Sequence, residues 1–326
     1  MKIDTTISIG VVGVGHLGNY HLKQLKSIPQ ISISGIYDDD PIRADKMSNQ
    51  HNVHSFSSLK GLLDKSQAVS VVTPTNTHYA VADKALNAGC HLFIEKPITD
   101  NINHAKSLLS KAKDLNKIIQ VGHIERFNPA FNILKKMKLN PQFIEVHRLS
   151  EFNIRGNDVP VILDLMIHDL DIILSLVQSE IKEIHANGVR VISSTPDIAN
   201  ARIEFKNSCV ANLTASRISQ KNMRKMRLFQ KQDYITIDFQ KGSIEEFRVS
   251  KIKPNIDNDD ILVELEGEEK KYIRYHKPYI SQYDALKKEL SHFIDSIRNA
   301  RKPETDGESA AKALRIALEI QNIIDK

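Results

Sequence analysis

Asp164 and His168 have the residue types and the spacing that a general base needs. They are four residues apart in a segment predicted to be helical, so they share one face of that helix, and Asp171 falls on the same face. A carboxylate beside an imidazole selects the ring tautomer and raises its basicity. A metal site formed by the same three side chains is an alternative, although zinc or iron usually recruits a further His or Cys. A histidine held in place only for packing is the other alternative.

Lys96 is the second candidate for chemistry. It follows Glu95 at the end of the apolar segment 91–94 and precedes Pro97. The carboxyl ends of parallel strands form the edge at which ligands bind in such sheets. A lysine at this edge can hold a hydroxyl oxygen and stabilise negative charge that develops on it. An exposed lysine that merely ends a strand is the alternative.

Polar residues also follow the preceding apolar strand, in the segment Thr73-Pro74-Thr75-Asn76-Thr77-His78. Because parallel strands end at one edge, this segment is expected to lie close to Lys96. The predicted cofactor contacts at this edge are Thr73, Pro74, Asn76, His78, Glu95 and Lys96. The same residue types are common in turns and helix caps, which is the structural alternative for this segment.

The cofactor is indicated by glycines near the start of the chain. Gly13, Gly15 and Gly18 form a GxGxxG pattern after a short apolar strand and at the start of an amphipathic helix over residues 19–28. The first glycine permits a tight turn, the second admits a pyrophosphate to the backbone, and the third allows the helix to pack closely on the strand. His16 and Leu17 belong to the same loop and are predicted to contact the cofactor too.

Asp38 completes the dinucleotide pattern, because it ends a second strand twenty residues after Gly18. Its carboxylate can accept hydrogen bonds from the adenosine ribose and would repel a 2′-phosphate. The sequence therefore predicts NAD in preference to NADP. Arg43 is the one residue in this region that could favour NADP instead.

Composition is that of a globular protein with 41% hydrophobic and 26% charged residues among 326, and no apolar run is long enough for a membrane span. The net charge of +5 is a mild bias toward anionic ligands and too small to indicate nucleic acid. Cys90 and Cys209 form no disulfide framework, which fits a reducing cytoplasm. Residues 1–6 lead directly into the first strand, so no signal peptide is expected.

Strand and helix patterns alternate over residues 1–123, as in a doubly wound parallel sheet of the Rossmann type. From residue 124 the pattern changes to one long helix over 159–177, a series of alternating segments between 181 and 249, and two terminal helices over 282–299 and 309–324. The expected fold class is therefore α/β. A Rossmann domain (1–123) is followed by an α+β domain (124–326) with a large, mostly antiparallel open sheet.

The order GxGxxG, acid, Thr-Pro-x-Asn-x-His, Glu-Lys-Pro and Asp-x-x-x-His resembles the glucose-fructose oxidoreductase/inositol dehydrogenase (Gfo/Idh/MocA) family nearly end to end. The resemblance implies that Lys96, Asp164 and His168 form the catalytic group and that NAD is the cofactor. No metal is expected, because no further His or Cys stands at ligand spacing from Asp164 and His168. It also implies a cis peptide bond before Pro97. The family often has glycine where this chain has Met166, which affects the space expected near the substrate.

A finer resemblance is to the branch that oxidises the 3-hydroxyl of UDP-N-acetylglucosamine-type sugars. It rests on the segments 122–130, 164–171 and 213–219. It implies that Glu125, Arg126, Asn128 and Arg217 contact the substrate, with the arginines offering donors to a diphosphate or carboxylate. For the basic stretch 217–231, a solvated sheet face is the alternative.

The family resemblance further implies a homodimer or homotetramer formed through the exposed face of the second sheet. Three alternatives to a nucleotide-sugar dehydrogenase stay open. The first is a dehydrogenase of a free sugar or polyol such as inositol, and the second is a glycosidase that uses NAD transiently. The third is a non-catalytic protein that senses the dinucleotide.

Overall fold

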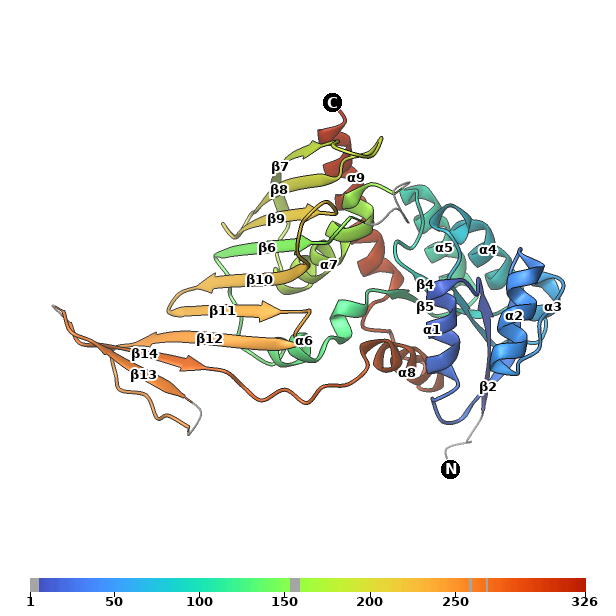
Figure 1. Ribbon diagram of the computed structural model, residues 1–326, viewed down its shortest axis with the longest axis horizontal. Helices are drawn as coiled ribbons and strands as arrows, with labels where there is room; N and C mark the ends of the chain where they lie inside the picture. The colour runs from blue at the N-terminus through green and yellow to red at the C-terminus, as the bar shows by residue number, and fades with distance from the viewer. Residues whose placement is uncertain (1–5, 153–158, 258–259, 268) are drawn as a thin grey trace. The chain divides into compact units, whose positions relative to one another are not determined.

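The computed structural model describes residues 6–152, 159–257, 260–267 and 269–326. The expectation about a signal peptide concerns residues 1–5 in part, and these lie outside the described residues. The chain forms two compact units, unit 1 (Met1–Phe127 with Asp284–Leu314) and unit 2 (Asn128–Tyr283 with Arg315–Lys326). Each unit has its own sheet, and both are drawn in Figure 1.

Unit 1 is a Rossmann-type parallel sheet, as predicted, and its strand order is β2-β1-β3-β4-β5. The strands are β1 (Ile7–Val12), β2 (Ile31–Tyr37), β3 (Ala68–Val71), β4 (His91–Glu95) and β5 (Ile119–Gly122). The helices are α1 (His16–Leu25), α2 (Pro41–His51), α3 (Leu59–Leu63), α4 (His78–Asn87), α5 (Ile102–Asp114) and α8 (Ala285–Arg298), with 3₁₀ turns η1 (Thr75–Thr77) and η2 (Ile124–Phe127). β3 and β4 are almost wholly buried, which explains their continuous apolar sequence.

The boundaries of the units differ from the predicted division at residue 123. Residues 284–314 belong to unit 1, although they follow the second sheet in the sequence. Helix α8 packs on α1, and its Leu290, Phe293 and Ile294 join the same buried cluster as Leu22 and Leu25. The chain after α8 stays with this unit, because Val121 N donates to the Thr305 carbonyl at 2.8 Å. The division of the chain into units therefore depends on the burial of the amphipathic helix α8 in the core of unit 1, far from it in the sequence.

Unit 2 has a nine-stranded sheet with order β13-β14-β12-β11-β10-β6-β9-β8-β7, antiparallel except for the pair β6–β9. The strands are β6 (Phe143–Leu149), β7 (Ile181–Val189), β8 (Ile198–Phe205), β9 (Val210–Ser216), β10 (Met223–Gln230), β11 (Asp233–Asp238), β12 (Ser243–Ser250), β13 (Ile261–Leu265) and β14 (Lys271–His276). The helical elements are α6 (Pro129–Leu134), the π-helical segment η3 (Ile162–Met166), α7 (Ile167–Leu176) and α9 (Gly307–Ile324), of which the part from Arg315 on belongs to unit 2. The mostly antiparallel sheet was predicted, whereas β6, β13 and β14 were not.

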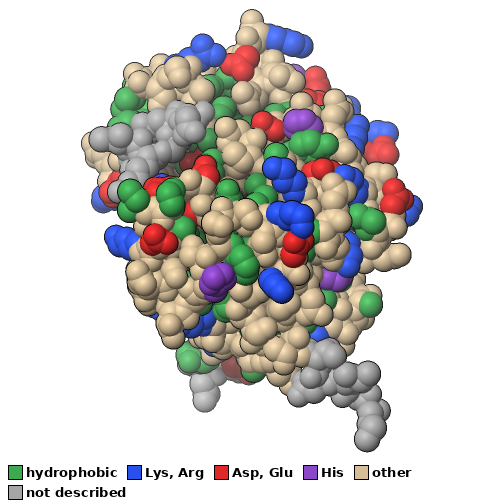
Figure 2. Space-filling view, turned by 90° about the vertical axis from the view of Figure 1, so that its right-hand side faces the viewer, with side chains coloured by type: hydrophobic (Ala, Val, Ile, Leu, Met, Phe, Trp, Pro, Cys, Tyr) green, Lys and Arg blue, Asp and Glu red, His purple; other side chains and the backbone are tan. Residues whose placement is uncertain are grey.

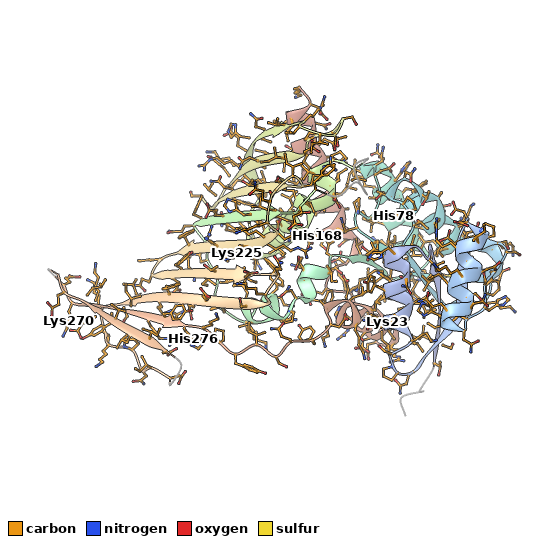
Figure 3. The ribbon with its side chains drawn as sticks, in the orientation of Figure 1. Lys23, His78, His168, Lys225, Lys270 and His276 are labelled. Carbon is orange, nitrogen blue, oxygen red and sulfur yellow. The ribbon has the colours of Figure 1, made fainter. Side chains whose placement is uncertain are left out.

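A buried ion pair holds α7 on the sheet of unit 2. Arg148 of β6 donates to both carboxylate oxygens of Asp169, from Nε at 2.7 Å and from Nη2 at 2.8 Å, and both side chains are buried. Such a two-pronged contact fixes orientation as well as distance. Asp169 follows His168 directly in α7, so the ion pair fixes the helix turn that carries His168, which is labelled in Figure 3.

On the face seen in Figure 2, acidic and basic side chains are interspersed rather than gathered into a single-sign patch. This distribution agrees with the small net charge of +5. No helix among the described residues is both long enough and apolar enough to cross a bilayer.

Candidate functional site: a dinucleotide cavity and two candidate catalytic segments

The glycine loop of unit 1 has the geometry predicted for it. Gly13 has φ +85°, a conformation that other residues rarely adopt. A Cβ on Gly18 would stand 2.0 Å from the Gly13 carbonyl oxygen, so only glycine allows this approach of α1 to β1. A Cβ on Gly15, at the N-terminal cap of α1, would meet nothing within 4 Å. The loop therefore leaves open space at a helix N-terminus, as a pyrophosphate requires.

Asp38 ends β2 beside this loop and is 7% exposed. Its Oδ2 accepts from Val14 N at 2.8 Å, and its Oδ1 accepts from Asp40 N at 3.0 Å and from Arg43 Nη1 at 3.1 Å. These donors stabilise a carboxylate with little access to water and orient it at the end of the strand. Arg43 also contacts Asp40 at 3.1 Å, so two carboxylates share its charge.

A cavity of about 540 Å³ lies between the glycine loop and Asp38. Its walls come from the ends of β1, β2 and β3 and from α4. The lining residues are Val12, Gly13, Gly15, His16, Leu17, Tyr37, Asp38, Asp39, Arg43, Leu59, Val72, Thr73, Pro74, Thr77, Val81 and Lys84. Apolar walls with a few convergent polar groups suit an adenosine nucleotide, so the residues present fit the dinucleotide that the glycine pattern predicts.

The cavity contains seven of the twelve residues predicted to contact the cofactor, which are Gly13, Gly15, His16, Leu17, Asp38, Thr73 and Pro74. The other five, Gly18, Asn76, His78, Glu95 and Lys96, do not line it. Gly18 has the packing role described above, and its contribution to binding is indirect.

His78 holds two loops together. It is 1% exposed, its Nδ1 lies 2.9 Å from the Pro97 carbonyl, and its Nε2 lies 2.8 Å from the Thr73 carbonyl. Burial lowers the pKa of His78, although the two carbonyl contacts oppose this effect. His78 therefore bridges the segments that follow β3 and β4, and its predicted contact with the cofactor stays a prediction.

Glu95 and Lys96 stand where β4 ends. Glu95 Oε2 accepts from Lys96 N at 3.2 Å, and Glu95 Oε1 lies 2.9 Å from His21 Nε2. Burial alone would raise the pKa of Glu95, but the His21 contact and the Lys96 charge outweigh it, so the pKa is lowered. The Lys96–Pro97 peptide bond is cis, as the family resemblance implied.

Asp164 and His168 lie on one helical stretch of unit 2, and both are half-buried. Asp164 belongs to the π-helical segment η3, and His168 is the second residue of α7. Asp171, expected on the same face, is buried at 4% exposure. Met166 is fully buried, so its bulk is directed into the core of unit 2. π-Helical turns inside α-helices recur at functional sites.

The residues expected to contact substrate are all largely buried, with exposures of 5–9% for Glu125, Arg126, Asn128 and Arg217. Asn128 caps α6 through Ala130 N at 3.0 Å and donates to the Phe239 carbonyl at 2.9 Å. Arg126 Nη2 donates to the Glu304 carbonyl at 3.3 Å.

Arg217 has a structural role in unit 2. Its Nε donates to Asp197 Oδ1 at 3.0 Å, its Nη1 to the Val159 carbonyl at 2.7 Å, and its Nη2 to Thr195 Oγ1 at 2.7 Å. Asp197 Oδ2 in turn accepts three backbone N–H groups, of residues 191–193. This network engages the guanidinium within unit 2, and the predicted substrate contact of Arg217 stays a prediction.

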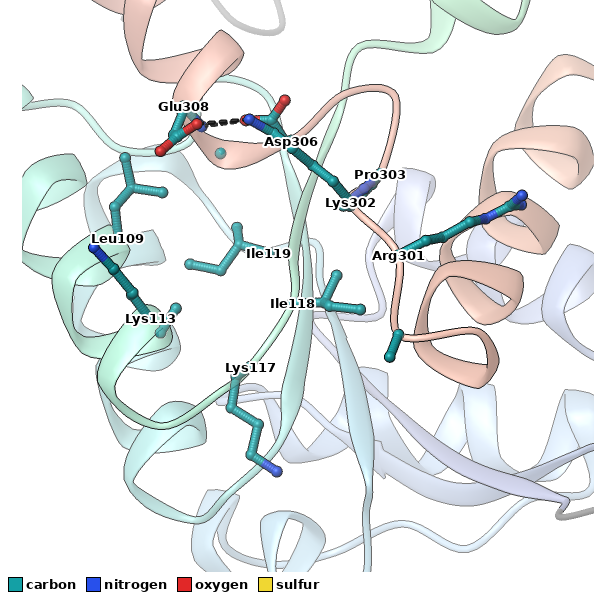
Figure 4. A pocket seen from close by; sticks show the side chains of 13 residues that line it. Leu109, Lys113, Lys117, Ile118, Ile119, Arg301, Lys302, Pro303, Asp306 and Glu308 are labelled. Carbon is teal, nitrogen blue, oxygen red and sulfur yellow. Dashed lines mark hydrogen bonds and ion pairs between the residues drawn. The ribbon is translucent and has the colours of Figure 1, made fainter.

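A second hollow in unit 1, of about 390 Å³, has lysines and an arginine at its rim (Figure 4). Lys302 is paired there with Glu308 at 2.6 Å and with Asp306 at 3.4 Å. Lys117 and Arg301 point away from one another in Figure 4, so the basic groups do not converge on one point. Among the described residues, no group of three or more His, Cys, Asp or Glu side chains is placed to hold a metal ion.

Comparison with known proteins agrees with this architecture. Residues 7–123 match the profile of the oxidoreductase family with an NAD-binding Rossmann fold, and residues 147–245 match the GFO/IDH/MocA C-terminal domain. The UDP-N-acetylglucosamine 3-dehydrogenase of Acidithiobacillus ferrooxidans is 34% identical over 97% of this chain and 96% of that protein. The chain belongs to the Gfo/Idh/MocA family.

Solved structures of the family agree with the fold. A structure of the Acidithiobacillus ferrooxidans enzyme superposes with a TM-score of 0.88 at 32% identity, covering 98% of both chains. The scyllo-inositol 2-dehydrogenase of Bacillus subtilis is 26% identical over 97% of this chain and 93% of that protein. This Gfo/Idh/MocA protein is thus an NAD-dependent oxidoreductase that acts on a CH–OH group.

Asp38 provides a test of cofactor preference. We expect catalytic efficiency with NAD to exceed that with NADP, and Asp38→Ala to reduce the preference by about 10-fold or more, the equivalent of one charged hydrogen bond. Initial rates with each cofactor give the ratio, and Asp64→Ala, which removes a surface carboxylate paired with Lys60, is the control. Equal efficiency of the unmodified enzyme with both cofactors would contradict the prediction.

Proposed function

We propose that the protein oxidises the 3-hydroxyl of a UDP-N-acetyl-hexosamine with NAD. The observation that supports this substrate is the 34% identity to the UDP-N-acetylglucosamine 3-dehydrogenase, which extends over nearly the full length of both proteins. A free polyol such as inositol is the second candidate, supported by the relative from Bacillus subtilis at 26% identity.

Lys96 and His168 are the proposed catalytic residues. The Lys96 ammonium donates a hydrogen bond to the substrate oxygen and stabilises the negative charge that develops when the proton leaves. His168 takes that proton on its imidazole, and Asp164 favours the ring tautomer that can accept it. When bound, NAD supplies the acceptor for the hydride that leaves the same carbon.

The residues that hold NAD are proposed to be those of the cavity in unit 1. The backbone N–H groups at Gly15 and His16 face the pyrophosphate, and Asp38 accepts from the ribose hydroxyls. The open space at Gly15 and the low exposure of Asp38 support this assignment. His78, Glu95 and Gly18 contribute by holding the loops, as their contacts within unit 1 indicate.

Substitution of the catalytic residues tests the mechanism. Lys96→Ala and His168→Ala should each lose on the order of 10²–10⁴-fold in kcat, the usual contribution of an acid–base group. NAD affinity, measured by fluorescence titration, should stay within about threefold because the cavity carries it. Lys23→Ala on α1 and His185→Ala on β7 are surface controls. Near-native kcat in either catalytic variant would refute its assignment.

The choice of substrate is tested by comparing a nucleotide sugar with its free sugar. Binding energy from a remote diphosphate can orient the ring for hydride transfer, so UDP-N-acetylglucosamine should have a kcat/KM at least about 100-fold above that of N-acetylglucosamine. Arg126→Ala should lower the efficiency of the conjugate more than that of the free sugar. Equal kcat/KM for both sugars in the unmodified enzyme would favour a polyol substrate. If Arg126→Ala lowers the thermal stability but leaves the ratio of the two kcat/KM values unchanged, Arg126 has a structural role.

A homo-oligomer is proposed from one face of the sheet in unit 2. Five rings stand in register across neighbouring strands with centroids 4.8–5.6 Å apart, namely Phe143, Phe229, Tyr234, Phe247 and Tyr275. On the edge strand β13, Ile261, Val263 and Leu265 are 42–58% exposed and continue this apolar face. A second copy of the chain would cover both, since apolar faces of this extent mark interaction sites.

Light scattering tests this oligomer. The unmodified protein should have the mass of a dimer or tetramer, and Phe247→Glu should shift it toward monomer because a charge would be buried without a partner. Ile42→Glu, at an exposed apolar position of unit 1, is the control and should not change the mass. A monomeric unmodified protein would refute the proposal.

A further inference from the structure

His21 stands in the interior of unit 1, although it lies on the helix that follows the glycine loop. It is 1% exposed and packs edge-on against Phe93, with ring centroids 5.4 Å apart. Its Nδ1 lies 2.9 Å from Ser70 Oγ on β3, and its Nε2 lies 2.9 Å from Glu95 Oε1 at the end of β4. One buried ring therefore joins a helix to two strands through polar contacts.

The hydrogen bonds around this ring can all be satisfied at once. Glu95 accepts only, so Nε2 carries the proton that it receives, and Nδ1 can accept from the Ser70 hydroxyl. Since Ser70 is fully buried, this contact also gives its hydroxyl a partner. Networks that are fully satisfied hold their members rigidly.

The Glu95 carboxylate connects His21 to the backbone of Lys96. The carboxylate oxygen that does not face His21 accepts from Lys96 N at 3.2 Å. Space for the carboxylate comes from Gly122, the register partner of Glu95 on β5, where a Cβ would stand 2.8 Å from Glu95 Oε1. The chain on the other side of Lys96 is held as well, since His78 contacts the Pro97 carbonyl.

We propose that His21 is a positioning residue that orients Lys96 through the Glu95 carboxylate. The inference rests on the proposed role of Lys96 in the oxidation. A lysine side chain has four rotatable bonds, so the direction of its ammonium depends on how firmly its backbone is held. A displacement of about 1 Å in a catalytic group can cost on the order of 100-fold in rate.

Two substitutions at His21 separate its contacts. In His21→Gln the amide nitrogen reaches the place of Nε2 and keeps a donor toward Glu95. In His21→Asn the shorter amide reaches the place of Nδ1 and keeps only the contact with Ser70. We expect His21→Asn to lower kcat by about 10- to 100-fold, with KM for NAD within about twofold, and His21→Gln to stay within about threefold of the unmodified enzyme.

His91→Asn is the matched control, because His91 begins the strand that Glu95 ends. Its Nδ1 accepts from Ile118 N at 3.1 Å, and the asparagine oxygen can take that role. Both kcat and KM should be unchanged in this variant. If His21→Asn fails to fold, Glu95→Asp tests the same contact from the carboxylate side, with the same expected loss in kcat.

A second measurement does not depend on catalysis. The rate at which acetic anhydride acetylates Lys96 in the folded enzyme, followed by mass spectrometry of the peptides after digestion, should change at least about threefold in His21→Asn, while that of Lys23 should not. If His21→Asn leaves kcat and Lys96 acetylation unaltered, or raises KM for NAD as much as it lowers kcat, the proposal is overturned. If Lys96→Ala remains active while His21→Asn still alters acetylation, the proposed function fails and the positioning role stands.

Discussion

The close contact of Gly18 with the Gly13 carbonyl is the constraint on which the rest of unit 1 depends. A side chain at residue 18 would place a carbon 2.0 Å from that oxygen. Helix α1 can therefore pack this closely on β1 only because residue 18 is glycine. This seating leaves the N-terminus of α1 open beside the cavity, and it places His21, three residues later, between Ser70 and Glu95. One helix therefore contacts both the cofactor loop and the carboxylate next to Lys96, the proposed catalytic lysine.

Features that depend on contacts between residues close in the sequence could be predicted, whereas features that depend on long-range packing could not. The glycine spacing, Asp38 and the strand patterns depend on local geometry, so the parallel sheet, its order of strands and helices, and most of the cavity could be predicted. The packing of α8 in unit 1 could not be predicted, because the sequence shows only that this helix has an apolar face and not which of the two sheets that face covers. Only burial of Phe293 and Leu290 beside α1 shows which core it completes.

Buried charged residues show where the sequence is least informative. Arg217 and Arg126 are predicted to bind anions, since exposed arginines often do. In the structure both are buried and donate to groups of their own unit, Arg217 to Asp197 and Arg126 to the Glu304 carbonyl. A sequence shows the type of a side chain but not its partner 20 or 178 residues away. His21 was overlooked for the opposite reason, because a histidine on the apolar face of a helix reads as packing.

The ion pair and hydrogen bonds of Glu95 form a polar network next to the candidate catalytic lysine, Lys96. A buried carboxylate alone is costly, and apolar residues of similar size would often stabilise the fold as well or better. Here the carboxylate is kept ionised by His21 and by the charge of Lys96, as its lowered pKa indicates. The ionised carboxylate accepts from the backbone N–H of Lys96, the residue proposed to stabilise the substrate oxygen. The contacts of Glu95 with His21 and with the Lys96 backbone thus link the packing of the sheet edge to the chemistry proposed there.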